Sequence, residues 1–148
     1  MIGAAPDFTL PDQSGAPWCL SAALQSGPVL LVFYRGDWCP YCNGQLLCYA
    51  RGFERIEGEG LQLAAISVDS VEQNAALAEK LLLPFPVLSD PDGAVIRTWE
   101  VWTDDEGGIA RPAVFLVEPD GSVALSYVGN DYADRPGDEL IFGRTAAV

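Results

Sequence analysis

The sequence has no histidine and a single lysine, Lys80, in 148 residues. Eight basic residues stand against 21 acidic ones, so the formal net charge is -13 at pH 7. Nucleic-acid phosphates are bound by clustered lysine and arginine side chains, so we expect no nucleic-acid partner. With no histidine and only four cysteines, the chain has few places for reactive chemistry.

Long apolar runs are also missing. No window reaches the 18 or more apolar residues of a membrane span, so no membrane partner is expected. The first residues, MIGAAPDFTLPDQSG, contain neither the basic region nor the apolar region of a secretory signal. We therefore expect a cytoplasmic, reducing location, in which a close cysteine pair is more often catalytic or metal-binding than structural.

The composition is that of a globular domain, with 49% hydrophobic and 20% charged residues. The length predicts one domain over residues 1–148. The run VLLVFY at residues 29–34 is typical of a buried strand. From Cys39 to Gly58 the apolar residues recur at helical spacing, with Pro40 suited to the first helical position.

The remaining pattern continues this alternation. A strand at 61–68, a helix at 70–83 and a short strand within 85–90 predict parallel strands joined by right-handed crossovers. Residues 94–102 fit either a helix or a strand, and 104–108 an acidic loop. Residues 113–117 and 123–128 predict an antiparallel hairpin, and 139–142 one helical turn. We predict an α/β fold of three layers with a mixed central sheet.

Cys39 and Cys42 lie where the first of these strands meets its helix, which is where open α/β sheets place their sites. If Cys39 caps the helix, both sulfurs lie beside the unpaired N–H groups of its first turn. Lowering a cysteine pKa from about 8.5 to about 6 requires about 3.4 kcal/mol. A helix end supplies only about 0.3–2 kcal/mol, so a cation or a further hydrogen bond is needed.

Four interpretations of the pair remain open. The two residues could be redox thiols, which the strand-to-helix context favours. They could join Cys19 and Cys48 in a zinc site, although the paired spacing of zinc ribbons and any histidine are missing. They could form a structural disulfide, or be incidental buried thiols. Cys48 is expected to face away from Cys42. Cys19 is expected to be a core residue, and a role as the resolving thiol is its alternative.

Several segments, taken in order, resemble the alkyl hydroperoxide reductase/thiol-specific antioxidant (AhpC/TSA) family of peroxiredoxin-like proteins. They are APDFTLPDQSG, VLLVFYRGDWCPYC, AAISVDS, PFPVLSDPDG and RPAVFLVEPDG. The resemblance implies a thioredoxin-like fold and a cysteine that attacks peroxide, becomes a sulfenic acid and is reduced by another thiol. It also implies a thioredoxin- or glutaredoxin-type reductant and a possible homodimer, with no metal or organic cofactor.

The resemblance nominates two different nucleophiles. Counting from Phe33-Tyr34, as in peroxiredoxins, leads to Cys42, with Cys39 at the position of the family threonine. The sequence Trp38-Cys39-Pro40-Tyr41-Cys42 equally resembles the thioredoxin-type motif, in which the first cysteine attacks. A thiol at the threonine position is a weaker donor to peroxide.

Further residues are assigned by the same resemblance. Arg111 lies near the family's active-site arginine and is expected to stabilise the thiolate and a bound peroxide oxygen. Pro112 lies at the offset of the thioredoxin cis-proline; if cis, it would bring its backbone against the sulfurs. Tyr34, Trp38 and Tyr41 are expected to line the substrate pocket with Pro112.

The sequence therefore predicts a thiol-dependent enzyme that reduces hydroperoxides and closes a Cys39–Cys42 disulfide. One alternative is a thiol-disulfide oxidoreductase that acts on protein disulfides. Another is a redox sensor or binding module without turnover.

Overall fold

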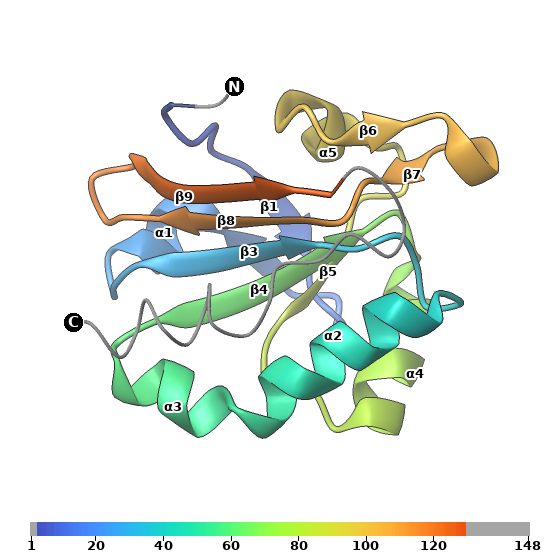
Figure 1. Ribbon diagram of the computed structural model, residues 1–148, viewed down its shortest axis with the longest axis horizontal. Coiled ribbons are helices and arrows are strands. Elements are labelled where there is room, and N and C mark those ends of the chain that lie inside the picture. The colour runs from blue at the N-terminus through green and yellow to red at the C-terminus, as the bar shows by residue number, and fades with distance from the viewer. Residues whose placement is uncertain (1–2, 130–148) are drawn as a thin grey trace.

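Five strands form the central sheet of the computed structural model, which describes residues 3–129. Their order across the sheet is β5-β4-β3-β8-β9 (Figure 1). The strands are β3 (Val29–Phe33), β4 (Gln62–Ser67), β5 (Val87–Ser89), β8 (Ala113–Val117) and β9 (Val123–Val128). β3, β4 and β5 run parallel, whereas β8 is antiparallel to both β3 and β9. The predicted mixed sheet and the predicted hairpin are confirmed.

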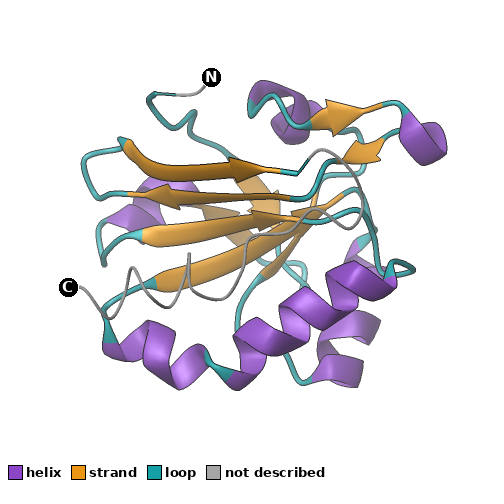
Figure 2. Ribbon diagram, in the orientation of Figure 1, coloured by secondary structure: helices purple, strands orange, loops and turns teal. Residues whose placement is uncertain are grey.

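Both faces of this sheet are covered (Figures 1 and 2). One face packs against α2 (Pro40–Arg51), α3 (Phe53–Gly58) and α4 (Val71–Leu81). The other packs against α1 (Leu20–Leu24), α5 (Ala94–Thr98) and the hairpin of β1 (Thr9–Pro11) and β2 (Pro17–Cys19). The three-layer α/β prediction is therefore confirmed. No helix within residues 3–129 is long and apolar enough to span a membrane.

Two-sided burial explains the apolar run of β3. Successive side chains of a strand point to opposite faces, so Leu31 and Phe33 join one core while Leu30 and Val32 join the other. All five residues of β3 are buried. A strand buried on both faces has no polar side to present, which is why it is continuously apolar.

The helices differ from the predictions in two places. The helix predicted from Cys39 to Gly58 is interrupted at Gly52, which leaves helical geometry and separates α2 from α3. Residues 94–102, which fitted a helix or a strand, form α5 and then enter β6 (Trp102–Thr103). The helix predicted at 70–83 is confirmed as α4, and Ser70 caps it by accepting the Gln73 N–H while Gln73 accepts the Ser70 N–H.

Other short elements were not predicted. The predicted acidic loop holds a 3-10 turn, η1 (Asp105–Gly107), between β6 and its antiparallel partner β7 (Ile109–Ala110). The elements before residue 28, namely β1, β2 and α1, were also missed, and β5 is shorter than predicted. The helical turn predicted at 139–142 lies outside the described residues.

The sheet brings several loops to one edge. Phe33, the last residue of β3, pairs with Ile66 of β4 and with Ala113, the first residue of β8. Ser67 pairs with Ser89, which ends β5. The carboxyl ends of the three parallel strands and the start of β8 therefore meet at the edge where α2 begins (Figure 1).

We predict that Gly44→Ala stabilises the protein. A Cβ added at this exposed position in α2 would meet no atom within 4 Å, and alanine is favoured over glycine inside a helix. The free energy of unfolding in urea should rise by about 1 kcal/mol. Gly93→Ala is the opposing control, because glycine there has a φ of 71° and an added Cβ would lie 2.3 Å from the Trp102 ring. A loss of stability in Gly44→Ala would contradict the prediction.

Candidate active site

Helix α2 begins at the cysteine pair. Cys39 is the N-cap residue with extended backbone, Pro40 occupies the first helical position, and Cys42 the third. The backbone N–H of Cys42 donates to Sγ of Cys39 across 3.4 Å. The predicted placement of both sulfurs at the positive end of a helix is confirmed.

The segment between β3 and α2 supplies a second donor. The backbone N–H of Arg35 donates to Sγ of Cys42 across 3.3 Å. Both cysteines are free thiols, and their side chains are 2% (Cys39) and 0% (Cys42) exposed. A hydrogen bond to a charged group contributes about 1.5–3 kcal/mol. Together with the helix end, this hydrogen bond favours the thiolate form of Cys42 and opposes the cost of burying its charge.

Arg111 and Pro112 lie at the same edge of the sheet, immediately before β8. The Arg111 guanidinium donates through Nε and Nη2 to the carbonyl oxygen of Gly129, across 3.2 and 2.8 Å. The predicted contact of Arg111 with the sulfur or with peroxide stays a prediction. Pro112 is buried, and every peptide bond in residues 3–129 is trans. Whether Pro112 is cis was open from the sequence, and the structure has it trans.

The predicted pocket aromatics lie at two depths. Tyr34 is fully buried in the same apolar cluster as Cys39, Cys42 and Val114, and its hydroxyl donates to Oδ1 of Asn74 across 3.0 Å. Burial raises the pKa of Tyr34, so its hydroxyl stays neutral. Tyr34 is thus a buried part of the apolar cluster that contains both cysteines, and its role in the substrate pocket stays a prediction.

Trp38 and Tyr41 are about half exposed, at 49% and 50%. They lie at the surface, and their role in lining the substrate pocket stays a prediction. The Arg35 guanidinium lies 5.1 Å from the centroid of the Trp38 ring, in a cation–π arrangement. The indole folds back over Gly36, where an added Cβ would lie 2.3 Å from its Nε1 atom.

The sequence analysis missed two polar residues beside the thiols. Asp69 follows β4, and its Oδ2 atom accepts the backbone N–H of Asp37 across 2.9 Å. Asn43, next to Cys42 on α2, donates through Nδ2 to the carbonyl of Asp37. Burial raises the pKa of Asp69, and the charge of Asp37 adds to this effect. The one available signal was the position of Asp69 at the end of a buried strand.

The other two cysteines lie elsewhere. Cys48 is half-buried on α2. Cys19 is the residue before α1, a helix that lies at the other end of the sheet from the start of α2 (Figure 1). Cys19 is only partly buried, so its assignment to the core is wrong. A hydrogen bond with the Ser21 hydroxyl lowers the pKa of Cys19. Within residues 3–129 no three cysteine, aspartate or glutamate side chains gather as a metal site, so the proposed zinc alternative lacks its ligands.

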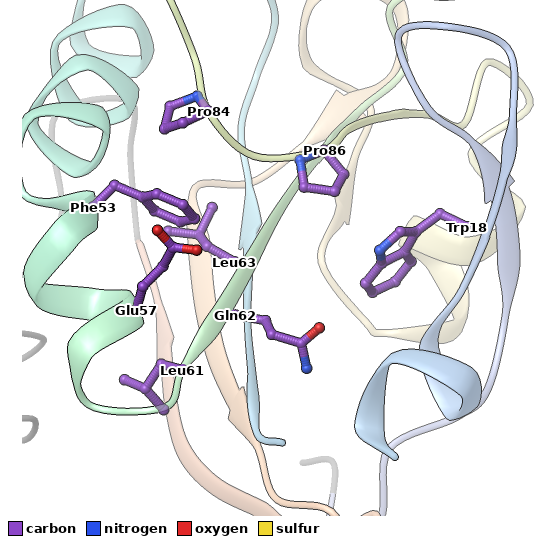
Figure 3. A pocket seen from close by; sticks show the side chains of 8 residues that line it. All are labelled: Trp18, Phe53, Glu57, Leu61, Gln62, Leu63, Pro84 and Pro86. Carbon is purple, nitrogen blue, oxygen red and sulfur yellow. The ribbon is translucent and has the colours of Figure 1, made fainter. Parts of the chain in front are cut away.

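A pocket with a volume of about 210 Å³ lies away from the thiols (Figure 3). Gln62, the first residue of β4, lines it together with Trp18 of β2 and Phe53 of α3. This is the amino end of β4, whereas the cysteine pair follows the carboxyl end of the parallel strand beside it. None of the predicted site residues lines this pocket.

This arrangement defines a thiol-based redox protein of the thioredoxin-like α/β class. The chain belongs to the AhpC/TSA family, whose model matches residues 2–126. It is 33% identical to peroxiredoxin Q of Sedum lineare over 136 residues, which are 92% of this chain and 73% of that protein. It is also 33% identical to peroxiredoxin Q of Arabidopsis thaliana, covering 93% of this chain and 63% of the relative.

Solved structures of peroxiredoxin-type proteins have the same fold as this chain. Peroxidoxin BcpB of Mycobacterium tuberculosis superposes with a TM-score of 0.88 at 27% identity, over 99% of this chain and 96% of that one. Peroxiredoxin Q of Xanthomonas campestris, at 23% identity, shares the fold with a TM-score of 0.81 over 95% of this chain and 90% of that one. Together the relatives support thiol-dependent peroxide reduction as the class of activity.

We predict that Tyr34→Phe lowers stability. The substitution leaves Oδ1 of the fully buried Asn74 without the hydroxyl that it accepts. An unsatisfied buried acceptor costs about 1–3 kcal/mol, measured as the free energy of unfolding in urea. Tyr41→Phe, at a half-exposed position, is the control and should change stability by less than about 0.5 kcal/mol. Equal effects of the two substitutions would refute this role of the Tyr34 hydroxyl.

Proposed function

We propose that this chain reduces hydroperoxides with Cys42 as the attacking thiol and Cys39 as the resolving thiol. The observation that carries this proposal is the hydrogen bond from the Arg35 backbone N–H to Sγ of Cys42. A thiolate is the nucleophilic form of cysteine, and a fixed N–H donor favours it. The buried Cys42 sulfur therefore has two sources of partial positive charge, the Arg35 N–H and the start of helix α2.

The reaction has two steps. The Cys42 thiolate attacks the terminal oxygen of the hydroperoxide, the O–O bond breaks, and the alcohol (or water, from hydrogen peroxide) leaves after taking up a proton. The Cys39 thiol then attacks the sulfur of the Cys42 sulfenic acid, and water leaves as the disulfide forms. An external dithiol restores both thiols by exchange, and is itself oxidised to a disulfide.

Two observations favour Cys42 over Cys39 as the nucleophile. The sequence resembles a thioredoxin-type site, in which the first cysteine attacks, in two features, and the trans peptide at Pro112 removes one of them. Cys39 is already engaged as the helix cap, accepting the N–H of Cys42. The count from Phe33-Tyr34 supports the same assignment.

The reductant that we propose is a thioredoxin- or glutaredoxin-type dithiol protein. Trp38 and Tyr41 support this choice, since both are half exposed beside Cys39 and give a second protein an apolar surface near the disulfide. The same surface favours the second candidate function, exchange with protein disulfides. From the sequence alone we also propose a cytoplasmic location and a homodimer.

Cysteine variants test the assignment of the nucleophile. One equivalent of peroxide should give a Cys39–Cys42 disulfide in the unmodified protein, seen as a peptide pair by mass spectrometry. Cys39→Ser should retain fast peroxide consumption and accumulate a sulfenic acid on Cys42 that dimedone traps. Cys42→Ser should react no faster than free cysteine, and Cys19→Ser is the control that should behave as the unmodified protein. Trapping of sulfenic acid only in Cys42→Ser would assign the attack to Cys39.

The expected role of Arg111 has its own test. Loss of a charge-assisted hydrogen bond to the reacting oxygen should lower kcat/KM for peroxide about 10- to 100-fold in Arg111→Ala, measured by stopped-flow consumption. Arg97→Ala is a suitable control, because Arg97 stacks on Trp102 of β6. An unchanged kcat/KM with reduced thermal stability would limit Arg111 to its contact with Gly129.

A further inference from the structure

The peptide groups of Asp37 are held from two directions. Its backbone N–H donates to Oδ2 of Asp69 across 2.9 Å, and its carbonyl accepts Nδ2 of Asn43 across 3.1 Å. Asp69 comes from the end of β4 and Asn43 from the first turn of α2. The end of β4 and the first turn of α2 therefore both hydrogen-bond to the middle of the segment that joins β3 to α2.

Asp69 is rigidly fixed to the sheet. Its backbone N–H donates to Oγ of Ser67 across 3.1 Å, and its carbonyl accepts the hydroxyl of Ser89. Ser67 and Ser89 are the last residues of β4 and β5 and pair with each other. The Asp69 side chain is only 5% exposed. The position of its carboxylate is thus set by two strand ends.

Asp37 lies midway between Arg35 and Cys39, two residues that each make a hydrogen bond with Cys42. Arg35, two residues earlier, donates its N–H to Sγ of Cys42. Cys39, two residues later, places its own sulfur against the Cys42 N–H. The short path is closely packed, because an added Cβ at Gly36 would lie 2.3 Å from the Trp38 indole. A shift of the Asp37 peptide would therefore displace both sulfur contacts.

The side chain of Asn43 is only partly satisfied in its hydrogen bonding. Its Oδ1 atom is buried and has no hydrogen-bond partner within residues 3–129. A buried acceptor without a donor costs about 1–3 kcal/mol, and such a group in a folded protein calls for an explanation. The contact that it makes is the one to Asp37.

We propose that Asp69 and Asn43 are positioning residues that clamp Asp37 and thereby hold the Arg35 N–H on the Cys42 sulfur. The proposal deepens the proposed function and rests on its assignment of Cys42 as the thiolate. What the clamp supplies is a hydrogen-bond acceptor at a fixed point, so the negative charge of Asp69 is not required for it. Asparagine at position 69 could accept the same N–H.

The experiment measures the pH dependence of iodoacetamide alkylation at Cys42, resolved by peptide mass spectrometry in the reduced protein. Asp69→Ala should give a thiolate pKa of Cys42 about one unit above that of Asp69→Asn, because both variants lose the charge of Asp69 and only Asp69→Ala also loses the acceptor that holds the Asp37 N–H. Asn43→Ala should raise this pKa above that of the unmodified protein. Asp69→Asn should keep the value of the unmodified protein or move it lower, since it retains an acceptor and loses a negative charge.

Asp90→Ala is the matched control. Asp90 is a buried carboxylate just beyond the end of the neighbouring strand β5, and its Oδ2 atom accepts the Ile96 N–H across 2.9 Å. It should lose a comparable amount of stability and leave the Cys42 titration unchanged. The clamp is refuted if Asp69→Ala gives the same Cys42 pKa as Asp69→Asn and Asn43→Ala leaves it at the unmodified value, or if Asp90→Ala raises it equally. If Asp69→Ala does not fold, the Cys42 pKa of Asn43→Ala tests the clamp by itself: a raised pKa supports it and an unchanged pKa refutes it.

The titration contains no peroxide, so it is independent of turnover. A shifted Cys42 pKa in a protein that consumes no peroxide would support the clamp and reject the proposed function. Normal peroxide consumption with an unshifted pKa in the variants would reject the clamp and leave the proposed function standing.

Discussion

The thiol site depends on a backbone hydrogen bond, from the N–H of Arg35 to Sγ of Cys42. The chain has a net charge of -13 and no histidine, so cations that could stabilise a thiolate are scarce. Backbone N–H groups provide partial positive charge without a titrating or mobile side chain. At the start of α2 the first helical turn adds its own unpaired donors. A thiolate can therefore be stabilised in an acidic protein by dipoles that the fold holds in place.

The topology of the sheet provides these dipoles. Parallel β3, β4 and β5 end at one edge, and antiparallel β8 starts there. This arrangement places the segment after β3 beside Asp69, which follows β4. It also places Arg111 and Pro112 at the same edge. The burial of both sheet faces keeps the strand ends fixed, so short polar contacts between the loops can determine the position of a sulfur.

Features encoded within a few neighbouring residues could be predicted from the sequence. The strand at β3, the capped start of α4 and the placement of Cys39 and Cys42 at a helix start all follow from local pattern. The contact between Asp37 and Asp69 could not be predicted, because it joins residues 32 positions apart and neither side chain has a distinctive neighbourhood. The break at Gly52 was missed because helical apolar spacing continues through it. The family resemblance indicated where Arg111 lies along the chain, but its hydrogen bonds to Gly129 depend on how β8 and β9 pair.

Cys39 explains why the motif resembles two families at once. As the N-cap residue it accepts the Cys42 N–H, a role that threonine also fills at helix starts. A threonine there would offer a hydroxyl donor to peroxide, whereas cysteine is a weak donor but provides a second thiol within the first helical turn. In the proposed reaction, the exchange of one for the other replaces a substrate contact with a thiol that can reduce the sulfenic acid. Because the helix cap is preserved, Cys42 keeps its place at the third helical position, and the backbone donor from Arg35 can serve it in either case.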